Sequence, residues 1–432
     1  MSDLVDSWIK HHLLLRIPTQ PGIAERKKNI ILVLYNIALR GRNIPAAPYV
    51  YNSHQADIRQ IPELHAIICD ILFWDISGLV ASSFYVAPTH DIVRLADALL
   101  ANSLLCHGKA NLSLEYAHKF ANGPYTAAFN AFSSMGVHKK IVSSAQLQTS
   151  FALLHEIAHF ECDDPSNALA NSYRKSFADI VDSQNSTAEY INGIDLTAIA
   201  PYLDKIDINE LLSLPLTENG MEPLFKAISQ IRSILLQYGH LVETPGISGE
   251  ERRRVLVLAC DNYLHGQKAK MIDGDIFITE GTCDLLALSE LLDFGCPGLN
   301  KTEARKMCID AYTLSLLTLD LIQGAMNAPK YTKGNGYDYM DTIYMRREKE
   351  KQLLPMVLMV YSHTHDEGLP PSEIDMLCEH FSNTARICDA MYAEFCDYVF
   401  SKDFIEKTFI PHGSPEWFKI YTEIDRLLQY PV

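Results

Sequence analysis

Residues 153–160 read LLHEIAHF and place two histidines, His155 and His159, four positions apart with Glu156 between them. In a helix, side chains at positions i and i+4 project from one face about one turn apart. Both imidazoles can therefore reach a single metal ion, and Glu156 lies next to the first of them. This HExxH spacing is typical of zinc sites in which the glutamate is a general base. The stretch predicts a zinc-binding helix with a hydrolytic role.

The residues around this stretch predict a long helix. Ser143 or Ser144 is a favourable N-cap, and apolar residues recur at helical spacing from there to about Cys162. Two aspartates and Pro165 follow, and proline disfavours a helical conformation in the residue before it. We therefore expect both histidines in the last two turns of the helix.

Composition limits the class of protein. The chain has 432 residues, of which 48% are hydrophobic and 21% charged, as in an ordinary globular protein. Its formal net charge of -16 argues against sequence-independent binding to nucleic acids or anionic membranes, which requires a surplus of lysine and arginine. We expect no nucleic-acid partner and no membrane partner.

The cysteines and the first residues bear on location. The ten cysteines form no CxxC pair and no regular framework, which suits a reducing compartment. Residues 1–6 are acidic where a secretory signal would be basic, and the apolar runs are too short or too interrupted to cross a membrane. These patterns predict a cytoplasmic protein.

Periodicity predicts an α+β fold that is mostly helical. A helix over 27–39 comes first, and a β-rich region follows that contains one helix over 91–100. Its expected strands cover residues 50–51, 66–76, 79–86, 112–116 and 125–132. Later helices are expected over residues 222–237, 250–265, 279–292, 302–326, 346–361 and 371–399.

A catalytic zinc usually has three protein ligands, so HExxH needs a partner elsewhere. The metzincin pattern would require glycine and histidine at positions 162 and 165, where Cys162 and Pro165 stand. A later pattern, Glu280 followed by Asp284 within TEGTCDLLA, resembles the ExxxD helix of the gluzincin metallopeptidases. By that resemblance Glu280 binds zinc and Asp284 accepts the free N–H of His155. An orienting carboxylate of this kind fixes the tautomer of the liganding histidine.

A second resemblance leaves the third ligand open. Gly281, Thr282 and Asp284 also resemble the GTxD part of the aspzincin motif, which would make Asp284 the ligand, although the Tyr-Gly that follows in that motif is missing. HExxH with a later ExxxD is similar, in addition, to the Lit-type phage-exclusion peptidases. We take Glu280 as the first candidate and Asp284 as the alternative.

The spacing of the two motifs predicts the domain organisation. Glu280 follows His159 by 121 residues (280 − 159), which is longer than expected for gluzincins and implies an insertion at about 166–270. We expect a zincin-like catalytic region over 1–300 and a helical C-terminal region over 301–432. The strand that contains residues 130–132 would be the edge that pairs with an extended substrate.

These residues predict a mechanism. Zinc held by His155, His159 and Glu280 would activate a water molecule, and Glu156 would take its proton during attack on a peptide carbonyl. His363, His365 or a tyrosine of residues 331–339 would stabilise the oxyanion. The substrate would be a protein or a peptide. Two alternatives stay open, a zincin-like pseudoenzyme that binds a partner or a ligand, and a zinc hydrolase of a non-peptide amide.

Overall fold

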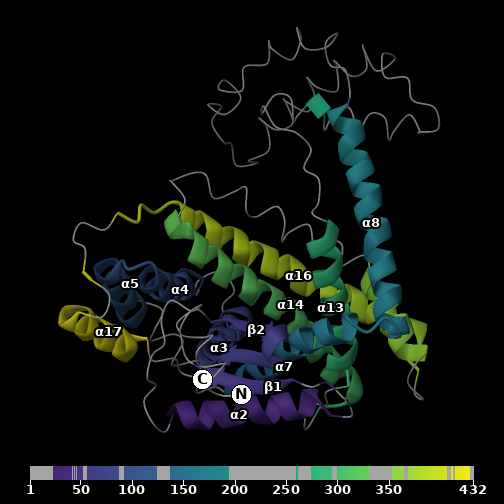
Figure 1. Cartoon of the computed structure of the whole chain (residues 1–432), viewed down its shortest axis with the longest axis horizontal. Coiled ribbons are helices and arrows are strands. Elements are labelled where there is room, and N and C mark those ends of the chain that lie inside the picture. The colour runs from purple at the N-terminus through teal and green to yellow at the C-terminus, as the bar shows by residue number, and fades with distance from the viewer. Residues whose placement is uncertain are drawn as a thin grey trace. The chain divides into compact units, whose positions relative to one another are not determined.

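The computed structural model is mostly helical and contains one small three-stranded sheet (Figure 1). It consists of two compact units, of which the first combines Met1–Arg174 with Thr279–Val432 and the second is Lys175–Ile278. Every site residue discussed below belongs to the first unit. The structure describes residues 23–40, 42, 44, 46–51, 56–86, 92–123, 137–193, 259–260, 274–293, 299–330, 353–363, 368–405, 410–411 and 414–428.

The elements keep the labels of Figure 1. Their order is α2 (Ile23–Ala38), β1 (Ala47–Tyr51), β2 (Ile58–Ile61), η1 (Pro62–Leu64), β3 (Ala66–Asp70), α3 (Ile71–Val86), α4 (Ile92–Cys106), α5 (Ala110–Asn122), α7 (His138–Cys162), α8 (Ala168–Asn192), α13 (Gly274–Leu291), α14 (Lys301–Asn327), η4 (Ala328–Lys330), α16 (Pro371–Phe400) and α17 (Pro415–Leu427). Residues 353–363 are also helical.

The sheet has the strand order β1-β3-β2. β3 pairs in parallel with β1 and antiparallel with β2, and all five of its residues are buried. β2 is therefore an edge strand of the described sheet. Its burial pattern, with Ile58 and Ile61 buried and Arg59 exposed between them, anchors the strand at both ends.

Asp70 ends β3 and starts α3. Its Oδ1 accepts a hydrogen bond from the Leu72 N–H at 3.0 Å, which satisfies one of the free donors at the helix N-terminus. Its Oδ2 accepts a bond from the Ala56 N–H at 3.2 Å. The chain therefore changes from strand to helix within one residue, and residues 71–76 are helical although they were expected in a strand.

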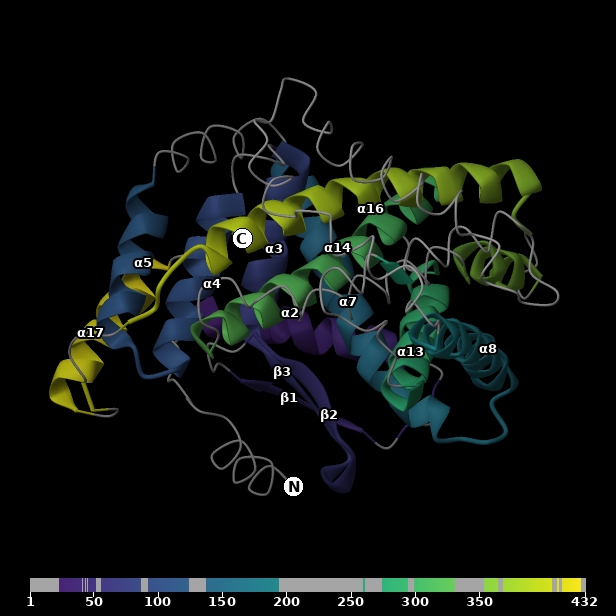
Figure 2. The same ribbon diagram turned by 90° about the horizontal axis from the view of Figure 1, so that it is seen from above.

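Helix α7 lies at the centre of the first unit. It packs against α2, α3 and α14 and against the strands β2 and β3. α14 packs in turn against α16, and the two helices lie side by side in both views (Figures 1 and 2). Because α7 contacts both the sheet and the surrounding helices, residues of a strand and of other helices can lie next to its side chains.

Two expected strands are wrong. Residues 79–86 belong to α3, whose first thirteen residues are all buried, so this helix shows no polar face that would reveal its period. Residues 112–116 belong to α5, where Ser113, Tyr116, Ala117 and Phe120 are buried at helical spacing. The region before α7 is thus less rich in strands than expected. Residues 125–132, including the expected substrate-binding edge at 130–132, lie outside the described residues.

Most expected helices of the first unit are confirmed. α2, α4, α14 and α16 cover the predicted ranges with small shifts at their ends. α7 begins at His138 instead of Ser143 or Ser144 and ends at Cys162 as expected. The described part of 346–361 is helical over 353–361, whereas the helices expected over 222–237 and 250–265 lie almost entirely outside the described residues.

The described residues of the second unit are the later part of α8, residues 259–260 and the start of α13. Phe177 and Phe277 pack edge to face there, with ring centroids 5.7 Å apart. The insertion expected at about 166–270 stays a prediction. The boundary expected at residue 300, between a catalytic region and a helical C-terminal region, also stays a prediction. Among the described helices, none has the length and apolar content that crossing a bilayer requires.

Candidate metal centre

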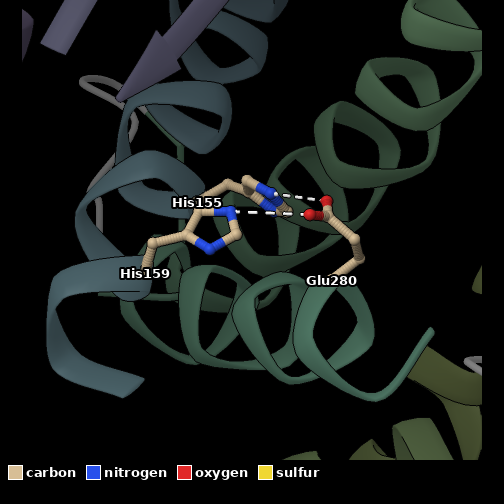
Figure 3. Close-up of side chains that lie close together, drawn as sticks. All are labelled: His155, His159 and Glu280. Carbon is tan, nitrogen blue, oxygen red and sulfur yellow. Dashed lines mark ion pairs between the residues drawn. The ribbon is translucent and has the colours of Figure 1, made fainter. Parts of the chain in front are cut away.

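His155 and His159 lie one turn apart near the end of α7. Leu153, Leu154 and Ile157 are buried beside them and fix the orientation of this part of the helix. The imidazole rings stand almost perpendicular to each other, with centroids 5.0 Å apart. Figure 3 shows both rings directed toward the same carboxylate.

That carboxylate belongs to Glu280, in the second turn of α13. Glu280 Oε2 lies 3.2 Å from His155 Nε2, and Glu280 Oε1 lies 3.7 Å from His159 Nε2. In the described part of the chain, these three residues form a group that could hold a metal ion, with all ligand atoms within 4.8 Å of one another. Tetrahedral zinc ligands at about 2.05 Å from the ion lie about 3.4 Å apart. The observed separations fit that arrangement.

Asp284 lies on the other side of the His155 ring. His155 Nδ1 is 2.7 Å from Asp284 Oδ1, and the aspartate is completely buried one turn after Glu280. A hydrogen bond from Nδ1–H to this carboxylate leaves the Nε2 lone pair of His155 directed at Glu280 and His159. Asp284 therefore contacts the candidate ligand His155 from the side opposite the group that could hold a metal ion, and Glu280 belongs to that group.

Glu156 is held by the edge strand. Its Oε2 accepts a hydrogen bond of 2.6 Å from the backbone N–H of Gln60 in β2. Gln60 pairs with Ile67 of β3 on its other side, so the sheet fixes the donor. Glu156 lines the same pocket as His155 and Glu280. This arrangement holds one carboxylate oxygen of Glu156 in place beside the candidate metal group.

Three pKa values in this cluster depart from their ordinary values. Burial lowers the pKa of His155, but the carboxylates of Asp284 and Glu280 outweigh it and raise the pKa to about 10. Burial raises the pKa of Glu156 to about 7. Burial and the charge on His155 lower the pKa of His159 to about 4. The acidic groups thus favour a positive charge at His155, and a bound cation would supply such a charge in place of the proton.

The pocket has a volume of about 170 Å³. Residues of β2, α7, α13 and α14 and one residue before β2 line it. They are Asp57, Ile58, Phe151, Ala152, His155, Glu156, Glu280, Leu316, Leu319, Asp320 and Gln323.

The suggested oxyanion donors are not brought into this pocket. His363 is exposed at the end of its helix, with Nδ1 2.7 Å from the carbonyl oxygen of Met359, and it does not line the pocket. His365 and residues 331–339 lie outside the described residues. Among the described residues, we therefore name no hydrogen-bond donor for the oxyanion.

A pair of thiols joins the two helices that carry the candidate ligands. Cys162, one turn after His159, and Cys283, one turn after Glu280, are buried with their Sγ atoms 3.7 Å apart. The contact shows how closely α7 and α13 pack beside the metal group.

Three residues near the candidate centre were not expected from the sequence. Gln60 contributes a backbone N–H, which no side-chain pattern reveals. Asp57 precedes the edge strand, where Arg59 forms an ion pair with it. Asp320 is a buried acid of α14. Its position among the leucines of that helix is the sequence signal that could have indicated its burial.

Comparison with known proteins gives no relative. No protein-family model matches the chain, and no curated protein and no solved structure matches it. Any statement about activity therefore depends on the residues and their geometry.

Proposed function

We propose that this chain is a zinc-dependent metallopeptidase of the gluzincin type. His155, His159 and Glu280 would hold the zinc ion, and Asp284 would orient His155. The observation that carries the proposal is the combination of a metal-ligand group and a held carboxylate, Glu156, in one pocket. A purely structural metal site does not need such a carboxylate.

Bound zinc supplies a Lewis acid that polarises a carbonyl group and lowers the pKa of coordinated water to ~7. Glu156 takes the proton of the attacking water and gives it to the leaving amine. The N–H of Gln60 fixes one carboxylate oxygen of Glu156, and in the proposed mechanism the other oxygen takes the proton. A general base of this kind contributes about 10²- to 10⁴-fold to the rate.

The substrate we propose is a protein or a peptide, and the compartment is the cytoplasm. All nine cysteines that the structure describes are free thiols, which suits a reducing environment. The net charge of -16 supports a protein or peptide partner over a nucleic acid.

The test combines metal analysis with cleavage of a peptide library by the full chain. Wild-type protein and Glu156→Gln should each hold about one zinc ion per chain, and His155→Ala should lose it. Cleavage should disappear in both variants. Glu161→Gln is the matched control, because Glu161 lies on the same helix, pairs with Arg42 and does not line the pocket.

The outcomes separate the alternatives. Undiminished cleavage by Glu156→Gln would contradict the mechanism. Zinc binding without hydrolysis of any amide would favour a pseudoenzyme, and hydrolysis of small amides but not of peptides would favour the non-peptide hydrolase.

A further inference from the structure

A pair of buried cysteines lies beside the candidate metal group without lining its pocket. Cys162 is the last residue of α7, and Cys283 lies in the middle of α13. Both are free thiols, and their Sγ atoms are 3.7 Å apart. The two residues are 121 positions apart in the sequence, so the packing of α7 against α13 brings them together.

The thiol pair and the metal group join the same two helices. Cys162 follows His159 by three residues on α7, and Cys283 follows Glu280 by three residues on α13. Residues three apart are neighbours on one face of a helix. A covalent bond between the sulfurs would therefore hold α7 to α13 one turn away from the place where a metal ion would hold them.

A disulfide at this position requires a small movement. The sulfur atoms of a disulfide are about 2.05 Å apart, so the two Sγ atoms would have to approach by about 1.7 Å. Glu280 Oε1 and His159 Nε2 are 3.7 Å apart, whereas tetrahedral zinc ligands lie about 3.4 Å apart. An approach of α13 to α7 would therefore bring the sulfurs together and bring the two ligand atoms closer to that separation.

The surroundings of Cys162 make it the more reactive thiol. Arg174 in α8 donates a hydrogen bond of 3.0 Å to the carbonyl oxygen of Cys162, which brings a positive charge close to this residue. The hydrogen bond with Cys283 and the charge of Arg174 hold the pKa of Cys162 below its usual value, although burial opposes them. The hydrogen bond with Cys162 and burial raise the pKa of Cys283. Because thiolates attack peroxides, Cys162 would react first.

We propose that Cys162 and Cys283 are an oxidative modification site, where hydrogen peroxide forms a reversible disulfide that joins α7 to α13 and strengthens metal binding. The effect on metal binding rests on the proposed metal centre, whereas formation of the disulfide can be measured without metal. In a reducing compartment such a bond is transient, as is usual for redox-sensing cysteines.

The reaction takes place in two steps. The Cys162 sulfur attacks one oxygen of hydrogen peroxide, the O–O bond breaks, and a sulfenic acid and one water molecule form. The Cys283 sulfur then attacks the Cys162 sulfur, the S–O bond breaks, and the oxygen leaves as a second water molecule. Together the two thiols lose two electrons and two protons, and one peroxide molecule is reduced to two water molecules.

The disulfide strengthens metal binding because both bonds restrict the same motion. A metal ion bound by His159 and Glu280 must hold α13 against α7, and a disulfide between these helices removes part of that freedom before the metal binds. By linkage, bound metal must favour the disulfide by the same factor. Couplings between two sites are typically about 5- to 150-fold.

The first experiment measures whether the bond forms. The metal-free full chain is oxidised with hydrogen peroxide, and peptide mapping without reductant locates the disulfides. We expect a bond between Cys162 and Cys283 that a phosphine reductant removes. Cys162→Ala and Cys283→Ala should each prevent it, and thermal melts identify either variant if it fails to fold. Cys106→Ala is the matched control, because Cys106 is also a buried residue at the end of a helix, α4, and this variant should keep the bond.

The second experiment measures the coupling in both directions. Chelator competition compares the zinc affinity of oxidised and reduced wild-type protein, and we expect the oxidised form to bind about tenfold more tightly. The same treatment should leave the zinc affinity of folded Cys283→Ala unchanged. In glutathione redox buffers, zinc should shift the midpoint potential of the disulfide by about 30 mV to more negative values, which is the equivalent of tenfold for a two-electron couple.

Each outcome bears on one proposal. Absence of the bond between Cys162 and Cys283 in folded, oxidised wild-type protein would overturn the modification site and leave the proposed metal centre untouched. A bond that forms without any gain in zinc affinity would overturn the coupling. A bond that forms in a protein that binds no zinc in either redox state would support the modification site and contradict the proposed metallopeptidase.

Discussion

Replacing Asp284 by asparagine tests the division of roles between the two acids of α13. The substitution keeps the shape of the side chain and removes its charge, next to a His155 nitrogen only 2.7 Å away. If Asp284 orients His155 without touching the metal, the variant should lower zinc affinity about 10- to 100-fold, which is the usual effect of removing such an orienting partner. That loss corresponds to about 1.4–2.8 kcal/mol.

Glu280→Gln is the matched variant, because it makes the same chemical change one turn earlier on the same helix. It replaces a charged ligand whose oxygens lie 3.2 and 3.7 Å from the two histidine Nε2 atoms. Its loss of zinc affinity should exceed that of Asp284→Asn by about tenfold or more, since a neutral amide is a weak zinc ligand.

Competition with a chromophoric chelator measures both affinities, and elemental analysis gives the stoichiometry. Melts in the presence of excess chelator show whether each variant folds without zinc. The reasoning is refuted if Asp284→Asn loses more affinity than Glu280→Gln, because Asp284 would then be the ligand, as the aspzincin resemblance suggests. Unchanged affinity in Asp284→Asn would refute the orienting role.

Zinc at 100 times its Kd should stabilise the fold by about 2.7 kcal/mol, so calorimetry should show a higher Tm with zinc than with a chelator. Phe151→Ala removes a fully buried ring and should cost about 3–5 kcal/mol in urea unfolding; a cost below about 1 kcal/mol would contradict its packing. Mild oxidation by hydrogen peroxide should join Cys162 to Cys283, whose sulfurs are 3.7 Å apart, and non-reducing peptide mapping should detect the bond. Gln60→Pro removes the N–H that holds Glu156 and should lower kcat while zinc content stays constant; an unchanged kcat would show that this bond is dispensable.

Local patterns in the sequence predict much of the candidate centre. His155 and His159 come together because one helix carries them, and the period of that helix is visible in its neighbours. The ExxxD spacing places Glu280 and Asp284 one turn apart on a second helix in the same way. The contact between α7 and α13 depends on tertiary packing. In the sequence, only the resemblance to the gluzincin motifs indicates that the two helices lie together.

The two wrong strand predictions have different physical causes. α3 is buried on all sides, so its apolar run carries no period and is indistinguishable from a buried strand. In α5, Leu112, Leu114 and Tyr116 alternate as in a strand, whereas the buried residues follow a helical period over a longer window. Asp70 caps α3 by accepting a hydrogen bond from the Leu72 N–H, so the strand expected over 66–76 ends at this residue and the helix begins.

Asp320 and Gln60 could not be assigned to the pocket from the sequence. Each lies in an element far along the chain from the HExxH helix, and neither belongs to a local motif. Gln60 acts through its backbone, so its residue type carries no signal.

The position of the second unit in the sequence determines when the candidate metal centre can form during synthesis. His155 and Asp284 are 129 residues apart, and the second unit, Lys175–Ile278, is made between them. At about 5–20 residues per second, translation of that interval takes roughly 6–26 s. For nearly all of this time the growing chain carries both histidines and Glu156 without Glu280. The candidate metal centre can therefore form only after the whole second unit has been translated.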